Sequence, residues 1–265
     1  MTSQIEHRGA AVAYLQEGRG EHLTLLHGVG GAMNNWDGVV AALGDTFCTL
    51  RYDLRGHGAS QKPPGPYSLD DFVDDLRSLL DACGVAATHL VGFSFGAMIA
   101  PAFALAHPHR VSSLTCISAV CGRTESERKA VLARSDALSR GEVGGNAAAA
   151  IERWFTPSFR EMHADVVEAR VRQLLANDTP GYAAAYRVFA ESDLADRVDG
   201  IDAPTLIMTG EHDQGSSPRM AKLMHERIAG SRLEILPGLR HSVLIEAPDR
   251  IARLLRAFIQ ATAQA

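Results

Sequence analysis

The chain has 265 residues, of which 46% are hydrophobic and 22% charged, and its formal net charge at pH 7 is -5. This length and composition are typical of one globular domain and exclude a disordered or fibrous chain. Because the net charge is negative and no run of lysine or arginine is present, we expect no nucleic-acid partner.

The sequence also bears on location and on bound metals. The first ten residues lack the basic and apolar regions of a signal peptide, which predicts a cytoplasmic protein. The apolar stretch 90–106 is shorter than the roughly 20 residues that a membrane span needs, so no membrane association is expected. The four cysteines form no C-x-x-C pair, and no metal-ligand or dinucleotide motif is present. We therefore expect no disulfide, metal or cofactor, and the sequence indicates no oligomeric state.

Short runs rich in leucine and β-branched residues recur along the chain and are separated mostly by helical patterns. This alternation predicts a mostly parallel sheet flanked by helices. One of the helices begins at a capping-box pattern of Ser68 with Asp71 and stops at Gly84. The predicted strands are residues 23–26, 47–52, 89–93, 111–118, 204–209 and 232–236.

The strand pattern disappears between about residues 121 and 202. Helical stretches such as 146–153 and 165–176 occupy this interval, which is too long for a simple crossover. We predict an α/β core formed by residues 1–121 and 203–265, with a helical cap inserted at 122–202. The sheet resumes at 203–210, and a helix at 249–261 closes the chain.

A nucleophile motif lies between a predicted strand and a predicted helix. Gly92-Phe93-Ser94-Phe95-Gly96 has the pattern G-x-S-x-G, in which a tight turn lifts the serine above the edge of the sheet. The N-terminus of the following helix favours developing negative charge. Ser94 is therefore the predicted nucleophile.

A serine nucleophile needs a histidine base and an acid behind it, in the chain order Ser, Asp/Glu, His. His241 follows a predicted strand and a Pro-Gly turn, on the edge of the sheet where ligands bind. The acid should leave the preceding strand, where both Glu211 and Asp213 follow the Gly210 turn. We favour Asp213, with Glu211 as the competitor.

Acyl transfer also needs N–H donors for the oxyanion. One is expected from Phe95, the residue after the nucleophile, and a second from Val29 in the glycine-rich loop after the first predicted core strand. His27 precedes this loop and is expected to brace it rather than to act as a base.

With these motifs in place, the chain resembles the α/β-hydrolase superfamily over essentially its whole length. The resemblance also includes residues 53–60, with the sequence DLRGHGAS, and the EAP tripeptide 246–248 after His241. A narrower resemblance is to the 3-oxoadipate enol-lactonases, in residues 51–58, 63–67 and 154–156. It implies hydrolysis of a small ester or lactone through an acyl-enzyme, as in aromatic catabolism.

An enol-lactone of this kind carries a carboxylate, which needs a cationic partner when buried. The candidates are Arg134, Arg153 and Arg187 in the cap, beside Trp154, which would close over the substrate ring. Three other functions remain open: hydrolysis of a carbon–carbon bond in a ring-cleavage product, cofactor-free perhydrolysis, and ligand binding by a receptor with the hydrolase fold.

Overall fold

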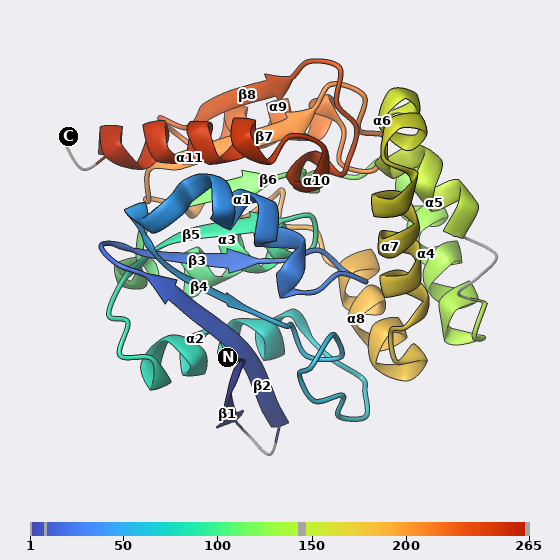
Figure 1. The fold of residues 1–265 in the computed structure, drawn as a ribbon, viewed down its shortest axis with the longest axis horizontal. Helices are drawn as coiled ribbons and strands as arrows, with labels where there is room; N and C mark the ends of the chain where they lie inside the picture. Colours follow the sequence, from blue (N-terminus) through green and yellow to red (C-terminus); the bar gives the residue numbers. More distant parts are fainter. Residues whose placement is uncertain (1, 8–9, 143–146, 263–265) are drawn as a thin grey trace.

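The computed structural model describes residues 2–7, 10–142 and 147–262. Its centre is an eight-stranded sheet with the strand order β1-β2-β4-β3-β5-β6-β7-β8 (Figure 1). The strands are β1 (Ser3–His7), β2 (Ala10–Gly18), β3 (His22–Leu26), β4 (Cys48–Tyr52), β5 (Thr88–Phe93), β6 (Val111–Ile117), β7 (Thr205–Gly210) and β8 (Arg232–Leu236). The α-helices are α1 (Asp37–Leu43), α2 (Leu69–Ala82), α3 (Gly96–Ala106), α4 (Glu125–Ser139), α5 (Ala147–Trp154), α6 (Pro157–Met162), α7 (Ala164–Leu175), α8 (Thr179–Glu191), α9 (Pro218–Arg227), α10 (Val243–Glu246) and α11 (Pro248–Thr262).

All six predicted strands are present, and each of their ends lies within one residue of the predicted position. From β4 to β8 along the sheet, neighbouring strands are parallel, as predicted. The sequence did not predict β1 and β2, which pair antiparallel with each other, while β2 also pairs antiparallel with β4. The sheet is therefore mostly parallel with an antiparallel edge.

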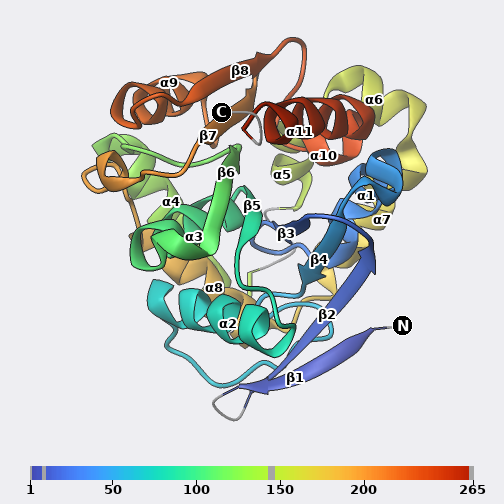
Figure 2. The ribbon, with the colours of Figure 1, turned by 90° about the vertical axis from the view of Figure 1, so that its left-hand side faces the viewer.

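Helices cover both faces of the sheet (Figure 2). On one face, apolar side chains of α2, α3 and α9 pack against the strands. On the other face, α1 and α11 do the same. The predicted capping box is confirmed at the start of α2, where the Ser68 hydroxyl accepts a hydrogen bond from the Asp71 N–H. Gly84 follows this helix with φ +67°, a conformation that glycine adopts at helix ends.

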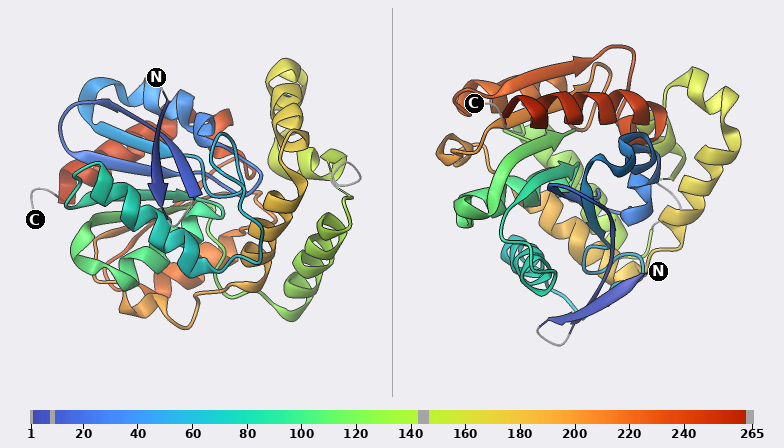
Figure 3. Two further views of the ribbon diagram at one scale, coloured as in Figure 1. Left: turned by 90° about the horizontal axis from the view of Figure 1, so that it is seen from below. Right: turned by 60° about the vertical axis from the view of Figure 1, so that its left-hand side comes forward.

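The helices α4 to α8, called the cap helices below, lie between β6 and β7 in the chain and gather at one end of the sheet (Figures 1 and 3). The predicted helical stretches 146–153 and 165–176 correspond to α5 and α7; residue 146 lies outside the described residues. Among the described residues, no helix is long and apolar enough to cross a membrane. The parallel strands from β3 to β7 end beneath the cap helices, so residues that follow these strands meet the cap.

Candidate active site

Ser94 lies in the turn between β5 and α3 and has a φ of +54°, which is rare for a residue other than glycine. The turn is tight enough that a Cβ added to Gly96 would lie 2.5 Å from the backbone oxygen of Leu26. The Ser94 N–H donates to the carbonyl of Ile117 at 2.9 Å, which ties the turn to β6. The G-x-S-x-G segment thus has the strand–turn–helix geometry that the motif predicts.

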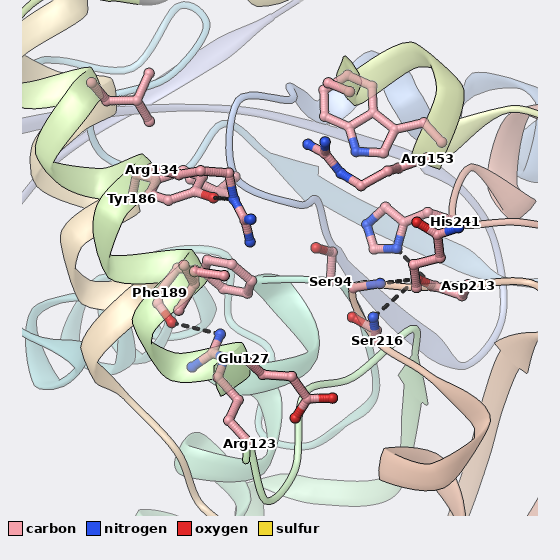
Figure 4. Close-up of a pocket in the computed structure, with 18 of the residues that line it drawn as sticks. Ser94, Arg123, Glu127, Arg134, Arg153, Tyr186, Phe189, Asp213, Ser216 and His241 are labelled. Atoms are coloured by element: carbon pink, nitrogen blue, oxygen red, sulfur yellow. Dashed lines mark hydrogen bonds and ion pairs between the residues drawn. The ribbon is translucent and has the colours of Figure 1, made fainter. Parts of the chain in front are cut away.

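His241 and Asp213 form a hydrogen-bonded pair. The Nδ1 atom of His241 donates to Oδ2 of Asp213 at 2.7 Å (Figure 4). The other carboxylate oxygen of Asp213 accepts from the N–H groups of Gly215 at 3.0 Å and Ser216 at 2.9 Å. Because Nδ1 carries the proton, the neutral ring keeps Nε2 as an acceptor, which is what a general base requires.

Glu211, the competing acid, is placed elsewhere. Its carboxylate accepts from the Gly238 N–H at 2.9 Å and lies 3.7 Å from Nε2 of His212, with about half of its side chain exposed. The structure brings Asp213, and not Glu211, into contact with His241.

The glycine-rich loop that the sequence predicts to supply an oxyanion donor, residues 28–31 and called the oxyanion loop below, passes beside Ser94. A Cβ on Gly28 would lie 3.0 Å from the Ser94 Cβ, a tighter contact than most Cβ atoms make, so glycine allows this close approach without displacing Ser94. The loop is closed by a hydrogen bond from Gly31 N–H to the Gly28 carbonyl at 3.0 Å. Among the described residues, the N–H groups of Val29 and Phe95 donate no hydrogen bond, which leaves both donors free for a ligand.

Two buried histidines brace this loop from behind. Nδ1 of His27 donates to the Gly28 carbonyl at 2.8 Å while its Nε2 accepts from Leu54 N–H at 3.0 Å, and Nε2 of His57 accepts from Gly30 N–H at 2.9 Å. Burial lowers the pKa of His27 to about 4, and burial together with the nearby His27 lowers the pKa of His57 to about 3. Both rings are therefore neutral at pH 7, and His27 braces the loop as expected.

A cavity of about 300 Å³ opens in front of Ser94, between the sheet and the cap helices. Such a volume is at the lower end of the range for small-molecule sites. Figure 4 shows charged, polar and aromatic side chains from both parts of the chain around it. Among the residues that line it are Ser94, Asp213 and His241 from the core, and Arg134, Arg153, Trp154, Tyr182 and Tyr186 from the cap helices.

Two of the three arginines that the sequence suggested lie at this cavity. Arg134 extends from α4, and its Nε donates to the Tyr186 hydroxyl at 3.2 Å. Arg153 extends from α5, and burial together with the charge of Arg134 lowers its pKa. Among the described residues, neither guanidinium group has a carboxylate partner within 4.0 Å, the limit for an ion pair.

Arg187, the third candidate, lies outside the cavity. Its guanidinium pairs with Asp136 at 2.8 Å and with Glu191 at 2.6 Å on the exposed surface of α4 and α8. The prediction that Arg187 lies at the substrate cavity is therefore wrong, because its side chain is already paired with two carboxylates and faces solvent.

Arg123 lines the cavity although sequence reasoning did not single it out. Its guanidinium donates to the carbonyls of Ser192 at 2.8 Å and Phe189 at 3.0 Å and stacks on the Phe189 ring. Burial lowers its pKa to about 10. The one signal available in the sequence was the position of Arg123 soon after the carboxyl end of β6. Its contacts indicate that it holds α8 in place.

The loop that carries His241 is hydrogen-bonded to the cap. Ser242 N–H donates to the Trp154 carbonyl at 2.8 Å. The Glu246 carboxylate accepts from the Thr156 N–H at 3.0 Å and from its hydroxyl at 2.6 Å. Trp154 is thereby fixed relative to His241.

A G-x-S-x-G turn between a strand and a helix, a hydrogen-bonded Asp–His pair and N–H groups without a partner, on one edge of a mostly parallel sheet, are typical of the class of α/β hydrolases. The α/β-hydrolase fold family matches residues 21–248, and the chain belongs to that family. It is 30% identical to the (E)-2-((N-methylformamido)methylene)succinate hydrolase of Acinetobacter baylyi over 253 residues, 94% of each chain. It is 28% identical to 3-oxoadipate enol-lactonase 2 of the same organism, covering 94% of this chain and 93% of that one.

A solved structure gives the same result. The enol-lactonase from Burkholderia xenovorans LB400 superposes with a TM-score of 0.91 at 26% identity, covering 97% of this chain and 100% of that chain. Within its family, the protein therefore lies near the enol-lactonase group.

Proposed function

We propose that the protein hydrolyses a small ester or lactone that carries a carboxylate, through an acyl-enzyme on Ser94. The observation that carries this proposal is the position of Ser94, in a left-handed turn on the cavity that His241 also lines, with His241 held by Asp213. No other serine of the described chain combines such a turn with a place on that cavity.

Each step has a group to perform it. Ser94 Oγ attacks the substrate carbonyl while Nε2 of His241 takes the hydroxyl proton. The N–H groups of Val29 and Phe95 bind the oxyanion of the tetrahedral intermediate. The C–O bond to the leaving group then breaks, and the leaving oxygen takes the proton from His241. A water molecule next loses a proton to His241 and attacks the acyl carbonyl. The C–O bond to Ser94 then breaks, Ser94 Oγ takes the proton back from His241, and the acid is released.

Two features support a carboxylate on the substrate. Arg134 and Arg153 bring two like charges to one cavity, and an anion bound between them would relieve their repulsion. The names of the two curated relatives also refer to derivatives of carboxylic acids, a methylenesuccinate and 3-oxoadipate.

Labelling tests the nucleophile. A fluorophosphonate probe should modify the wild-type protein at Ser94 in a one-to-one ratio, and Ser94→Ala should not react. A wild-type protein that is not labelled would contradict the proposal and favour a binding protein with a hydrolase fold.

A substrate screen tests the carboxylate. Enol-lactones and half-esters with a free carboxylate should have higher kcat/KM than neutral esters of equal size. Because a charge-assisted hydrogen bond contributes about 1.5–3 kcal/mol, Arg134→Gln or Arg153→Gln should lower this preference about tenfold or more. Arg187→Gln is the matched control and should leave the preference unchanged, because Arg187 faces solvent.

Two results of the screen would change the proposal. If neutral short-chain esters are preferred and neither cavity arginine alters the ratio, the protein is a general carboxylesterase. If ring-cleavage diketones are the best substrates, it is a carbon–carbon bond hydrolase.

A further inference from the structure

One face of α7 lies against the oxyanion loop. Arg170 Nη1 donates to the Gly30 carbonyl at 2.9 Å, and Asn177, two residues after the helix, donates to the same oxygen at 3.3 Å. Gln173, one turn after Arg170, bonds to Asn35 at 2.9 Å, just beyond the loop. The cap helices therefore reach the catalytic core at the loop that supplies an oxyanion donor.

The hydrogen bonds in this loop run in one direction. The carbonyl of Gly30 and the N–H of Gly31 belong to one peptide group, and Gly31 N–H donates to the Gly28 carbonyl at 3.0 Å. The carbonyl of Gly28, which also accepts from Nδ1 of His27 at 2.8 Å, shares a peptide group with the N–H of Val29. Both peptide bonds are trans, since the one cis bond in the described chain is Gly65-Pro66. In a trans peptide group the C=O and N–H point in opposite directions. A donor on each carbonyl therefore fixes the direction of the N–H on its far side.

We propose that Arg170 is a positioning residue of the oxyanion hole, acting on the Val29 N–H through two hydrogen-bonded peptide groups. The Arg170 cation lies at the start of this series of hydrogen bonds, and the oxyanion would lie at the end of the series. Hydrogen bonds linked in this way polarise one another in the same sense, which strengthens the last donor. The inference rests on the proposed acyl transfer at Ser94.

The charge of Arg170 is the feature that needs explaining. Asn177 already donates to the Gly30 carbonyl, so a neutral side chain would satisfy that oxygen. The Arg170 guanidinium lies 4.8 Å from the centre of the Trp154 ring and has no carboxylate partner among the described residues. Burial lowers its pKa to about 10, and it remains charged at pH 7. A buried cation without a carboxylate partner has a desolvation cost, and a contribution of Arg170 to binding the oxyanion would offset that cost.

Substitutions at one helix position, with a neighbour as control, test this role. Arg170→Gln removes the charge, Arg170→Lys keeps it, and Arg172→Gln is the matched control, because Arg172 is exposed on the same helix and pairs with Glu168. The measurements are kcat and KM for a neutral p-nitrophenyl ester and for an ester that carries a carboxylate, and the inhibition constants of a trifluoromethyl ketone and of the product acid.

Loss of a whole oxyanion donor costs about a hundredfold or more in kcat, and weakening one should cost a part of that. We expect Arg170→Gln to lower kcat about tenfold with little change in KM. Affinity for the trifluoromethyl ketone, which forms an oxyanion on Ser94, should fall by the same factor, while affinity for the product acid should not. Arg170→Lys should keep at least about half of the wild-type kcat, and Arg172→Gln should match the wild type.

Three results would overturn the inference. The first is a wild-type kcat and ketone affinity in Arg170→Gln. The second is a loss confined to KM for anionic substrates, because that would mean that Arg170 binds the substrate directly. The third is an equal loss in Arg170→Lys and Arg170→Gln, which would leave no role for the charge. If Arg170→Gln does not fold, Arg170→Met takes its place as the neutral variant. Failure of the proposed function is distinguishable, since the wild-type protein itself would then not react with the fluorophosphonate.

Discussion

Acid should destabilise this protein strongly because its two buried histidines cannot take up protons in the folded state. The pKa values of His27 and His57 in the fold are about 4 and about 3, whereas an exposed histidine titrates near 6.5. Below pH 6.5 the unfolded chain therefore binds more protons than the folded chain, and the free energy of unfolding falls as the pH falls. Each pH unit costs about 1.4 kcal/mol per histidine, so each should lose about 2 kcal/mol by pH 5. The loss continues until the pH reaches the folded pKa.

Urea unfolding at pH 7.5 and pH 5 measures this effect. His57→Gln keeps an acceptor for the Gly30 N–H but cannot titrate, so its drop in stability between the two pH values should be about 2 kcal/mol smaller than in the wild type. His27→Gln also cannot titrate, so its drop in stability should be smaller than in the wild type by the same amount. His109→Gln, at an exposed position, is the control and should behave like the wild type. If both variants lose as much stability as the wild type, the two histidines are not held neutral by the fold, and the reasoning fails.

Four further substitutions test the site and the turn around it. Ser94→Ala should lower kcat on the order of 10³-fold or more with the fold intact by circular dichroism, and a variant that keeps a tenth of the activity would remove Ser94 from the mechanism. Asp213→Asn should slow turnover strongly and Glu211→Gln should change it little, because only the former contacts His241; the reverse ranking in kcat would assign the acid to Glu211. Gly96→Ala should lower the free energy of unfolding by about 1–3 kcal/mol, since its Cβ would lie 2.5 Å from the Leu26 carbonyl oxygen; an unchanged urea midpoint would show that the turn has more room.

The strands of the core could be predicted because each is a short apolar run bounded by polar or glycine-rich segments. The edge strands β1 and β2 could not, because β2 begins with an Ala-rich stretch without clear alternation and β1 is mostly exposed. The pairing of β2 with β4 depends on contacts between distant parts of the chain, which a local pattern does not report.

The core of the candidate site followed from motifs, since the nucleophile, base and acid each follow a recognisable strand. The cap did not. Whether an arginine faces the cavity depends on how its helix is rotated against its neighbours. Sequence reasoning could not distinguish Arg153 from Arg187, although only Arg153 lines the cavity. Arg170 was missed because its role depends on one carbonyl, that of Gly30, which lies 140 residues away in the chain.

The hydrogen bonds between the His241 loop and the cap limit how this protein can be recombined with its relatives. A chimera that exchanged residues 122–202 alone would replace Thr156, whose N–H and hydroxyl donate to the Glu246 carboxylate, and burial already raises the pKa of that carboxylate. It would also replace the cap segment whose Trp154 carbonyl accepts from Ser242 N–H, so the support of the His241 loop would depend on how the new cap packs. A chimera should therefore exchange residues 241–246 together with the cap. The cap that lines the substrate cavity and the loop that positions His241 are inherited together.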